Sequence, residues 1–347
     1  MWAPGPTFSY IGRTFFQERV GIVTHLGSFA CLDIIGDIHG YAEDLEFLLE
    51  RLGYREQNGA YRHEDRDRCA VFLGDFIDRG SDIKRVLRIV RAMTEAGTAH
   101  AVLANHEFNA IAYATLHEGR FLRPHTPTHE WQHRHTLEQL GGLAVPDHWL
   151  DWFRTLPPYL ANDEVRIVHA CWDPWAVAVI DDALARHGGL THDFMVEALP
   201  SGPPAERGDL FAATEWLLKG KEVPLPADHA PLADKEGIRR RRMRVRWFGL
   251  PPEPTYADML FPLGSTAGLP SESVPGEALK AVRLPGNAYP VDAPPVFFGH
   301  YWLTGSVGPQ APNVICLDYS VARGGRLVAC TWRQGEPITP ASFTTSR

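Results

Sequence analysis

Aspartate, asparagine and histidine side chains recur in this sequence directly after short apolar runs. They are Asp37, His39, Asp75, Asp78, Asn105, His106, His169 and His300. Carboxylates, imidazoles and an amide oxygen suit Mn, Fe or Zn, and no thiolate stands among them. Six such ligands could hold two divalent ions that share one carboxylate. Two ions roughly 3.5–4 Å apart make a hydroxide from bound water and stabilise a phosphoryl group during its transfer.

Three of the polar clusters follow a repeated pattern of apolar strand, polar loop and helix. The copies read CLDIIGDIHGYAEDLEFLLERLG, CAVFLGDFIDRGSDIKRVLRIVRAM and HAVLANHEFNAIAYATLH. In the second copy we expect Ser81 to cap the helix. The repetition predicts an α/β sheet with right-handed crossovers. Such sheets place functional loops beyond the carboxyl ends of their strands, so the polar clusters are expected to meet there.

In the rest of the chain, proline and glycine residues and apolar runs indicate where helices and strands begin and end. Two prolines end a short helix at 147–158, and a buried strand at 165–170 leads to His169. The Pro- and Gly-rich stretch 173–290 predicts an irregular insertion that covers or shapes the site. Strands return near the C-terminus at 295–300, 313–318 and 326–332. We therefore expect a single domain over 31–335, between an N-terminal extension at 1–30 and a tail at 336–347.

Composition narrows the class of protein. The 347 residues are 44% hydrophobic and 22% charged, which is typical of a globular chain. The net charge of −8 argues against indiscriminate nucleic-acid binding. No apolar run approaches the roughly 20 residues of a membrane helix, and the N-terminus lacks the layout of a signal peptide. Five cysteines without a CxxC motif predict core residues in a reducing compartment, so we expect a cytoplasmic protein.

The order GDIHG, GDFIDRG, NHE, a strand-end histidine and then GH resembles the metallophosphoesterase (calcineurin-like) superfamily. The likeness is greatest to the branch of the phosphoprotein phosphatases and the bacterial diadenosine tetraphosphatases. It covers residues 31–110 well, and 165–172 and 295–332 more loosely. The resemblance implies an αββα sandwich of two mixed sheets flanked by helices, with a binuclear metal centre at one edge.

The resemblance also implies a role for each matching residue. Asp37 and His39 would bind the first metal, and Asp75 would bridge both. The ligands that complete the second metal would be Asn105, His169 and His300. The ions would be two divalent metals, with Mn expected first and Fe or Zn as alternatives.

Three further roles concern the reacting phosphoryl group. His106 would protonate the leaving oxygen, and Asp78 would orient His106. Arg79 would clamp phosphate oxygens, for which a planar guanidinium is well suited. Leu103 and Ala104 stand where the protein phosphatases commonly have Arg and Gly. This departure weakens a protein-phosphatase reading and leaves the metal ligands untouched.

Two other segments could contact a substrate. Arg242, Arg244 and Arg246 alternate with apolar residues, so a strand would place the three guanidinium groups on one face for phosphate oxygens. The alternative is a solvated edge strand. Tyr301 lies beside a predicted ligand and could stack on a base or an aromatic ester. The histidine-rich stretch 125–135 is expected to be a mobile surface loop near the site, with a third metal site as the alternative.

These observations predict a binuclear metal-dependent hydrolase of phosphate esters or anhydrides. A metal-bridging hydroxide would attack phosphorus, and His106 would act as general acid. The expected substrate is a small nucleotide-type molecule such as a dinucleoside polyphosphate, with no membrane or nucleic-acid partner. The alternatives are a phosphoprotein phosphatase, a nucleic-acid end phosphatase, or a binding module without catalysis. The sequence does not predict the oligomeric state.

Overall fold

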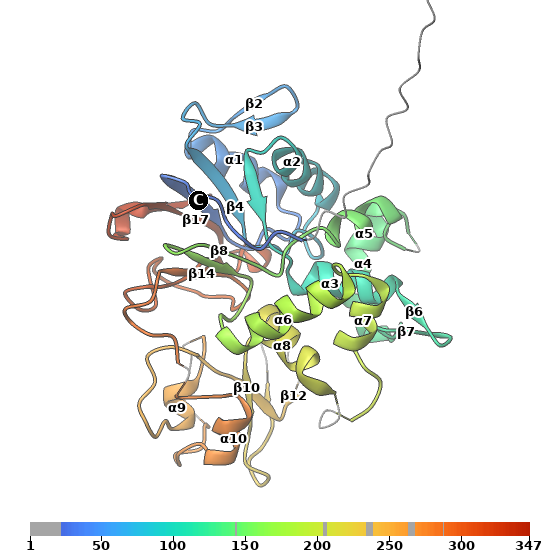
Figure 1. Cartoon of the computed structure of the whole chain (residues 1–347), viewed down its shortest axis with the longest axis vertical. Helices are drawn as coiled ribbons and strands as arrows, with labels where there is room; N and C mark the ends of the chain where they lie inside the picture. Colours follow the sequence, from blue (N-terminus) through green and yellow to red (C-terminus); the bar gives the residue numbers. More distant parts are fainter. Residues whose placement is uncertain (1–21, 143, 204–206, 234–238, 263–267, 287) are drawn as a thin grey trace, which may run out of the picture.

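The computed structural model describes residues 22–142, 144–203, 207–233, 239–262, 268–286 and 288–347. Two β-sheets pack face to face at its centre, and helices lie outside them (Figure 1). The helix–sheet–sheet–helix arrangement predicted from the sequence is thereby confirmed. No helix in the described part of the chain is long and apolar enough to cross a membrane.

The first sheet contains the strands of all three repeats. Its members are β1 (Cys31–Ile35), β4 (Arg68–Phe72), β5 (Ala99–Ala101), β16 (Asp318–Tyr319), β17 (Arg326–Arg333) and β18 (Phe343–Thr345). They run in the order β16-β17-β1-β4-β5, and β18 also pairs with β17. Strands β1, β4 and β5 are parallel, whereas β17 is antiparallel to β1. The sequence repeats therefore lie side by side, with the loops after them at one sheet edge.

The second sheet is smaller and brings two more functional segments to the same region. Its strands, in spatial order, are β15 (Val314–Cys316), β14 (Val296–Phe298), β9 (Arg166–Val168) and β8 (Tyr159–Ala161). Strand β14 is parallel to both β15 and β9. The chain leaves β9 at His169 and β14 at Gly299, so these residues also follow carboxyl ends of parallel strands.

Side chains alternate between two apolar layers, as the period of a strand requires. Leu32 and Ile34 of β1 point into the layer between the sheets, where they join Phe297 of β14 and Ile315 of β15. Ile35 instead belongs to the larger cluster that the helices cover. Both faces of the central strands are therefore buried, which explains why the repeats begin with continuous apolar runs.

Helices follow the strands of the first half. They are α1 (Ala42–Arg51), α2 (Ile83–Glu95), α3 (Asn105–Ala114), α4 (Pro127–Leu140) and α5 (Asp147–Phe153). The buried residues of α2 are the predicted face Ile83, Val86, Leu87, Val90 and Met93. The helix cap differs from the prediction: Asp82, and not Ser81, accepts the backbone N–H of Arg85 at 3.2 Å. Short hairpins connect this part of the chain: β2 (Arg55–Gln57) with β3 (Ala60–Arg62), and β6 (Leu116–His117) with β7 (Arg120–Phe121).

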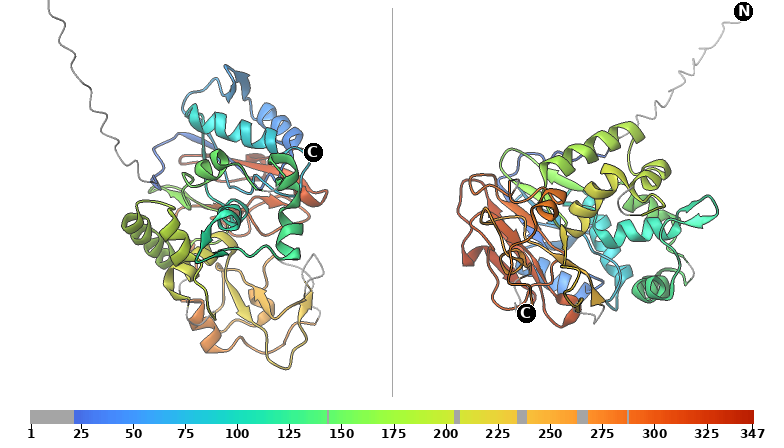
Figure 2. Two further views of the ribbon diagram at one scale, coloured as in Figure 1. Left: turned by 90° about the vertical axis from the view of Figure 1, so that its right-hand side faces the viewer. Right: turned by 90° about the horizontal axis from the view of Figure 1, so that it is seen from below.

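The stretch 173–290 is more regular than its composition predicts. It contains α6 (Pro174–His187), α7 (His192–Ala198), α8 (Gly208–Lys219), α9 (Tyr256–Met259) and α10 (Gly276–Ala281). It also contains the strand pairs β10 (Glu222–Pro224) with β13 (Arg242–Arg244), and β11 (Leu232–Ala233) with β12 (Arg239–Arg240). Helices α6 and α8 pack on each other (Figure 2), and apolar residues on several of their sides hide the helical period.

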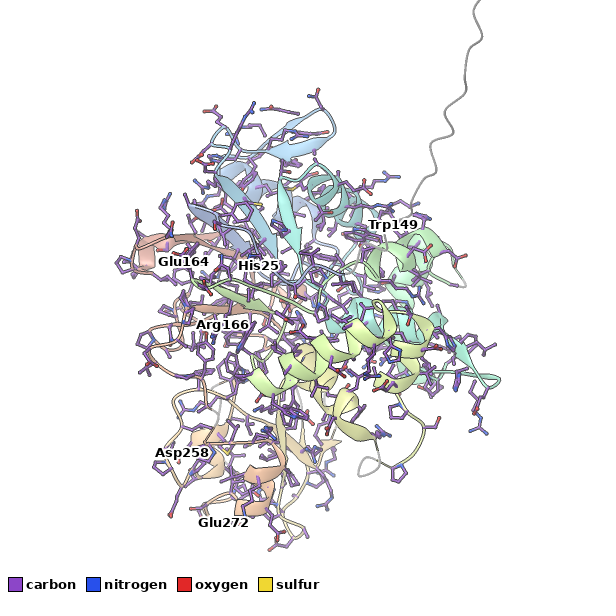
Figure 3. The ribbon with its side chains drawn as sticks, viewed as in Figure 1. His25, Trp149, Glu164, Arg166, Asp258 and Glu272 are labelled. Atoms are coloured by element: carbon purple, nitrogen blue, oxygen red, sulfur yellow. The ribbon has the colours of Figure 1, made fainter. Side chains whose placement is uncertain are left out.

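The later half of this stretch gathers at one end of the molecule, where Figure 3 labels Asp258 and Glu272 well away from His25 beside the sheets. His25 belongs to the predicted N-terminal extension. Residues 22–30 of that extension are described, and Leu26 donates its N–H to Ala161 of β8 at 2.8 Å. Residues 1–21 lie outside the described part of the chain. The predicted C-terminal tail contributes β18 to the first sheet.

Candidate metal centre and its surroundings

The five loops that carry the predicted ligands converge at the carboxyl ends of β1, β4, β5, β9 and β14. Within the described residues, two sets of three ligand atoms lie within 4.8 Å of one another. The sets are His39, Asp75 and His106, and Asp75, His169 and His300. Residues that are far apart in the sequence therefore share one buried site, and Asp75 belongs to both sets.

Asp75 is the centre of the arrangement. Its Oδ2 lies 3.4 Å from Nε2 of His39, 3.5 Å from Nε2 of His169 and 3.9 Å from Nε2 of His106. Its Oδ1 accepts the backbone N–H of His106 at the start of α3, at 3.2 Å. Although burial opposes the charge, the three histidines lower the pKa of Asp75. A carboxylate that stays ionised between two sets of imidazoles could bridge two cations.

The imidazole rings are oriented by backbone carbonyls. Nδ1 of His39 donates to the carbonyl of Ile77 at 3.0 Å, and Nδ1 of His169 donates to that of Leu73 at 2.8 Å. Each bond directs the lone pair of Nε2 toward Asp75, as second partners do for histidine ligands of metals. Burial lowers the pKa of His39 to about 3 and also lowers that of His169, so both rings are neutral at pH 7.

Several buried polar atoms in the site have no hydrogen-bond partner among the residues that the structure describes. They are Oδ1 of Asp37, Nε2 of His39 and Nε2 of His300. The side-chain amide of Asn105 lies beside them, 2.9 Å from Nε2 of His169 and 2.8 Å from Nδ1 of His300. Buried groups of this kind are costly unless something neutralises them. Cations would satisfy all of these atoms at once, and the residues therefore fit a pair of divalent metals.

Asp37 and His300 lie together although 263 positions separate them in the chain. The backbone N–H of His300 donates to Oδ2 of Asp37 at 2.9 Å. Burial, together with the charges of Asp318 and Asp75, raises the pKa of Asp37 well above its usual range. Among the described residues, Asp37 belongs to neither of the two sets of ligand atoms, although its contact with His300 places it at the site.

The site is built on left-handed backbone. His39, Asp75, Asp78, Arg79 and His300 all have positive φ angles, between 48° and 73°. This region is uncommon for residues other than glycine and is held only by strong surrounding contacts. One such contact is Glu107, whose buried carboxylate accepts the N–H groups of Asp75, Phe76 and Ile77 at 3.0, 2.8 and 3.3 Å. The motif NHE marked this residue, yet the sequence did not predict its anchoring role.

His106 and Asp78 form a pair beside the centre. Nδ1 of His106 lies 2.5 Å from Oδ2 of Asp78. Burial lowers the pKa of His106, but the charges of Asp75 and Asp78 raise it above its usual value overall. The pKa of Asp78 is well below its usual range because the hydrogen bonds from His106 and His133 outweigh its burial. A hydrogen-bonded histidine with a raised pKa at the edge of the site can supply a proton.

Arg79 lies at the same edge. Its charge contributes to lowering the pKa values of His39 and His106, which places the guanidinium close to both. The guanidinium sits 4.3 Å from the ring centroid of Trp302, and that of Arg323 sits 4.6 Å from the same centroid. The sequence predicted neither Trp302 nor Arg323. Their nearness in sequence to GH and to the strand at 313–318 was the available signal.

Tyr301 requires a correction. Its side chain is 1% exposed and packs against Phe261 and Phe298, with ring centroids 4.6 and 5.6 Å apart. A buried core residue does not stack on a substrate, so the prediction of a substrate contact is wrong. Positive φ angles at His300 and Trp302 turn the chain there, and the ring between them points into the core.

Arg242, Arg244 and Arg246, which we call the basic stripe, do alternate with buried residues. Met243 and Val245 are buried, whereas Arg242 and Arg244 have side chains that are 55% and 41% exposed. Both face Glu222, at 3.5 and 4.0 Å. The charge of Arg244 contributes to lowering the pKa values of His169 and His300, so this arginine extends toward the metal centre. Arg246 lies farther along the chain, and its Nε is buried without a hydrogen-bond partner in the described part of the chain.

The histidine-rich stretch is also different from its prediction. Residues 127–140 form α4, and Thr126 caps the helix by accepting the N–H of His129. His133 is buried, and its Nδ1 lies 2.8 Å from Oδ1 of Asp78. The expected mobile loop is therefore a helix in contact with the site.

Comparisons with known proteins show what this chain is similar to. A family model described as calcineurin-like phosphoesterase matches residues 32–247. The bis(5'-nucleosyl)-tetraphosphatase PrpE [asymmetrical] of Oceanobacillus iheyensis is 44% identical over 199 residues, which are 54% of this chain and 76% of that protein. The symmetrical bis(5'-nucleosyl)-tetraphosphatase of a Janthinobacterium strain is 30% identical over 304 residues, 85% of this chain and 90% of the other. A cold-active protein-tyrosine phosphatase of a psychrophilic Shewanella shares the fold, with a TM-score of 0.50 and 15% identity over 95% and 84% of the two chains.

Proposed function

Because the chain belongs to the calcineurin-like phosphoesterase family, whose members hydrolyse phosphoester or phosphoanhydride bonds, we propose that it hydrolyses dinucleoside polyphosphates. The observation that carries the catalytic part is the arrangement around Asp75. One ionised carboxylate faces the Nε2 atoms of three histidines, beside further buried atoms that lack hydrogen-bond partners within the described ranges. The substrate class rests on the tetraphosphatases to which the chain is similar.

The proposed metal ligands are those named from the motifs. Two divalent ions at this site would activate water at neutral pH and neutralise charge on the phosphoryl oxygens. Manganese is our first choice, since carboxylate, amide and imidazole ligands suit it, with iron or zinc as alternatives. The ligands would be Asp37, His39, Asp75, Asn105, His169 and His300.

The other residues act on the substrate directly. Arg79 would bind non-bridging oxygens of the phosphoryl group, because its fork of donors matches their geometry. His106 would give its proton to the leaving oxygen and would be held for that purpose by Asp78. Arg244, together with Arg242 and Arg246, would bind phosphates farther along the polyphosphate chain. We place the reaction in the cytoplasm, since the five cysteines are free and buried.

The decisive experiment compares three substrates at equal concentration with Mn²⁺ supplied. They are diadenosine tetraphosphate, a phosphopeptide and a 5'-phosphorylated oligonucleotide. We expect the dinucleotide to be hydrolysed fastest, and chromatography of its products distinguishes ATP plus AMP from two molecules of ADP. Faster turnover of the phosphopeptide would refute the proposed substrate, and turnover of none of them would refute the function.

A substitution in the basic stripe, compared with a matched control variant, tests whether the stripe binds the distal phosphates. Arg244→Gln should raise KM for diadenosine tetraphosphate more than KM for p-nitrophenyl phosphate, because only the longer substrate reaches that side chain. Arg333→Gln should change neither, since Arg333 pairs with Cys31 at the opposite end of β1 from the site. Equal effects of Arg244→Gln on the two substrates would contradict a role in binding the distal phosphates.

A further inference from the structure

Helix α4 holds the loop that carries Asp78 and Arg79, although it lies outside every motif of the family. Two of its side chains, His133 and Thr136, reach the carboxylate of Asp78 from the side opposite to His106. They stand three positions apart, so they share one face of the helix. That face is buried at both positions, with His133 5% exposed and Thr136 fully covered.

The carboxylate of Asp78 is hydrogen-bonded on both oxygens. Oδ2 accepts from Nδ1 of His106 at 2.5 Å. Oδ1 accepts from Nδ1 of His133 at 2.8 Å and from the hydroxyl of Thr136. A carboxylate with one oxygen fixed by two donors cannot rotate to leave His106. The orientation of the His106 ring is therefore set from α4 through Asp78.

The same helix also fixes the backbone of this loop. The hydroxyl of Thr136 accepts the N–H of Asp78 at 2.9 Å, and Nδ1 of His135 donates to the carbonyl of Arg79 at 2.6 Å. Asp78 and Arg79 are consecutive residues with φ angles of 65° and 71°. Two adjacent left-handed residues that are not glycine need such external support.

Gln139 adds a third anchor one helical turn further on. Its Nε2 donates to the carbonyl of Gly80 at 2.9 Å, and its Oε1 accepts the N–H of Ile83 at 2.7 Å. The loop is therefore bonded to α4 from Asp78 to the first residue of α2. Because these contacts are continuous along the loop, α4 supports the loop rigidly.

We propose that His133 and Thr136 are positioning residues for proton transfer, which act through Asp78 on His106. This inference rests on the proposed hydrolase function. Neither residue touches the reacting atoms, so we expect each to act mainly on the step in which His106 gives up its proton. Loss of either donor leaves Oδ1 of Asp78 with a single donor, and the His106 ring is then held less firmly in its direction toward the leaving oxygen.

The test uses two substrates that differ only in their leaving group. p-Nitrophenolate departs readily without a proton, whereas the phenolate of phenyl phosphate is a much poorer leaving group and needs one. We expect His133→Leu and Thr136→Val to lower kcat on phenyl phosphate by about ten- to a hundredfold, the range for a hydrogen bond to a charged group. The fall on p-nitrophenyl phosphate should be much smaller.

Conservative variants separate this role from a general effect on folding. His133→Asn keeps an N–H near the position of Nδ1, and Thr136→Ser keeps the hydroxyl, so both should recover most of the lost rate on phenyl phosphate. Glu138→Gln changes an exposed residue of the same helix and should behave like the wild-type protein. Equal losses on the two substrates, or no loss on either, would overturn the proposal.

A double-variant cycle tests the route through Asp78. In an Asp78→Asn background, His133→Leu should cause little further loss on phenyl phosphate, because the residue acts through a group already changed. Full additivity would overturn the proposal. A readout without turnover is the NMR signal of the His106 Nδ1 proton in metal-free protein, which should shift in His133→Leu and not in Glu138→Gln. If the wild-type protein hydrolyses neither ester, the proposed function has failed, and not merely this inference.

Discussion

Gly299 stands at the point where the end of β14 approaches the metal centre. A Cβ atom at this position would lie 1.9 Å from Oδ1 of Asp37, whereas real Cβ atoms essentially never come closer than 3.0 Å to such a neighbour. Gly299 is itself fixed, since its N–H donates to the carbonyl of His169 at 2.8 Å. The substitution Gly299→Ala must therefore displace the carboxylate of Asp37 by at least about 1 Å.

The size of the effect follows from this displacement. A misplacement of about 1 Å in a catalytic site can lower the rate about a hundredfold. Disturbed support of a metal ligand typically weakens metal binding by about ten- to a hundredfold. Packing an extra methyl group into a filled site also costs about 1–3 kcal/mol of stability. We therefore expect Gly299→Ala to fold with a lowered Tm, to bind Mn²⁺ more weakly and to lose most of its kcat.

The assay is a titration with Mn²⁺, followed by calorimetry and by hydrolysis of p-nitrophenyl phosphate. The matched control is Gly276→Ala, because a Cβ there meets no heavy atom within 4 Å and the backbone is not left-handed. If Gly299→Ala bound two Mn²⁺ ions with wild-type affinity and turned over normally, the reasoning about Asp37 as a metal ligand would be refuted.

Three other predictions address the same protein. Asp78→Asn removes a negative charge that raises the pKa of His106. Because the protonated ring is the acid, the alkaline limb of the pH profile of kcat/KM should move to lower pH. A limb that does not move would contradict this role of Asp78. Lys221→Met leaves Asp173 buried without Nζ of Lys221, which lies 2.6 Å from its Oδ2. The free energy of unfolding in urea should fall by about 3–5 kcal/mol, and Lys221→Met/Asp173→Asn should regain much of this loss. A fall of less than about 1 kcal/mol would count against a stabilising pair. Chelation should abolish hydrolysis, with elemental analysis finding two ions per chain when Mn²⁺ restores it, and activity that survives full removal of metal would exclude the proposed chemistry.

The family and the layered fold could be predicted from short motifs, for a physical reason. Asp37, Asp75 and His106 each follow a strand that is buried on both faces, and such strands are continuous apolar runs in the sequence. Parallel strands bring the residues after them to one edge. The comparisons confirm the resemblance to metallophosphoesterases. The roles of the individual site residues remain predictions that the experiments above can test.

The contribution of α4 was missed because two of its buried residues, His133 and Thr136, are polar. They lie on the covered face with Leu140, at the spacing of a helix, but threonine is mostly exposed in proteins and histidine is intermediate. The stretch therefore reads as a solvated loop. The dipeptide Thr126-Pro127 was the usable signal, since a capping threonine followed by proline is typical of a helix start.

Tyr301 shows a second limit of prediction from the sequence. Adjacency to His300 in the sequence indicates that a residue is near the site, but not toward which side its ring points. That direction depends on the turn of the backbone at His300 and Trp302, which the residue types do not reveal. The indole of Trp302, one position further along the chain, is the ring that contacts Arg79.

Strand β1 lies between β4 and β17, so the first sheet joins segments that are about 300 positions apart in the sequence. Until β17 is in place, one edge of β1 has no strand to pair with, and an unpaired apolar edge is prone to mispairing with other chains. The contact of Asp37 with His300 likewise joins residues 263 positions apart. The site is therefore complete only after the distant segments have come together, which couples folding of the sheets to the assembly of the metal ligands.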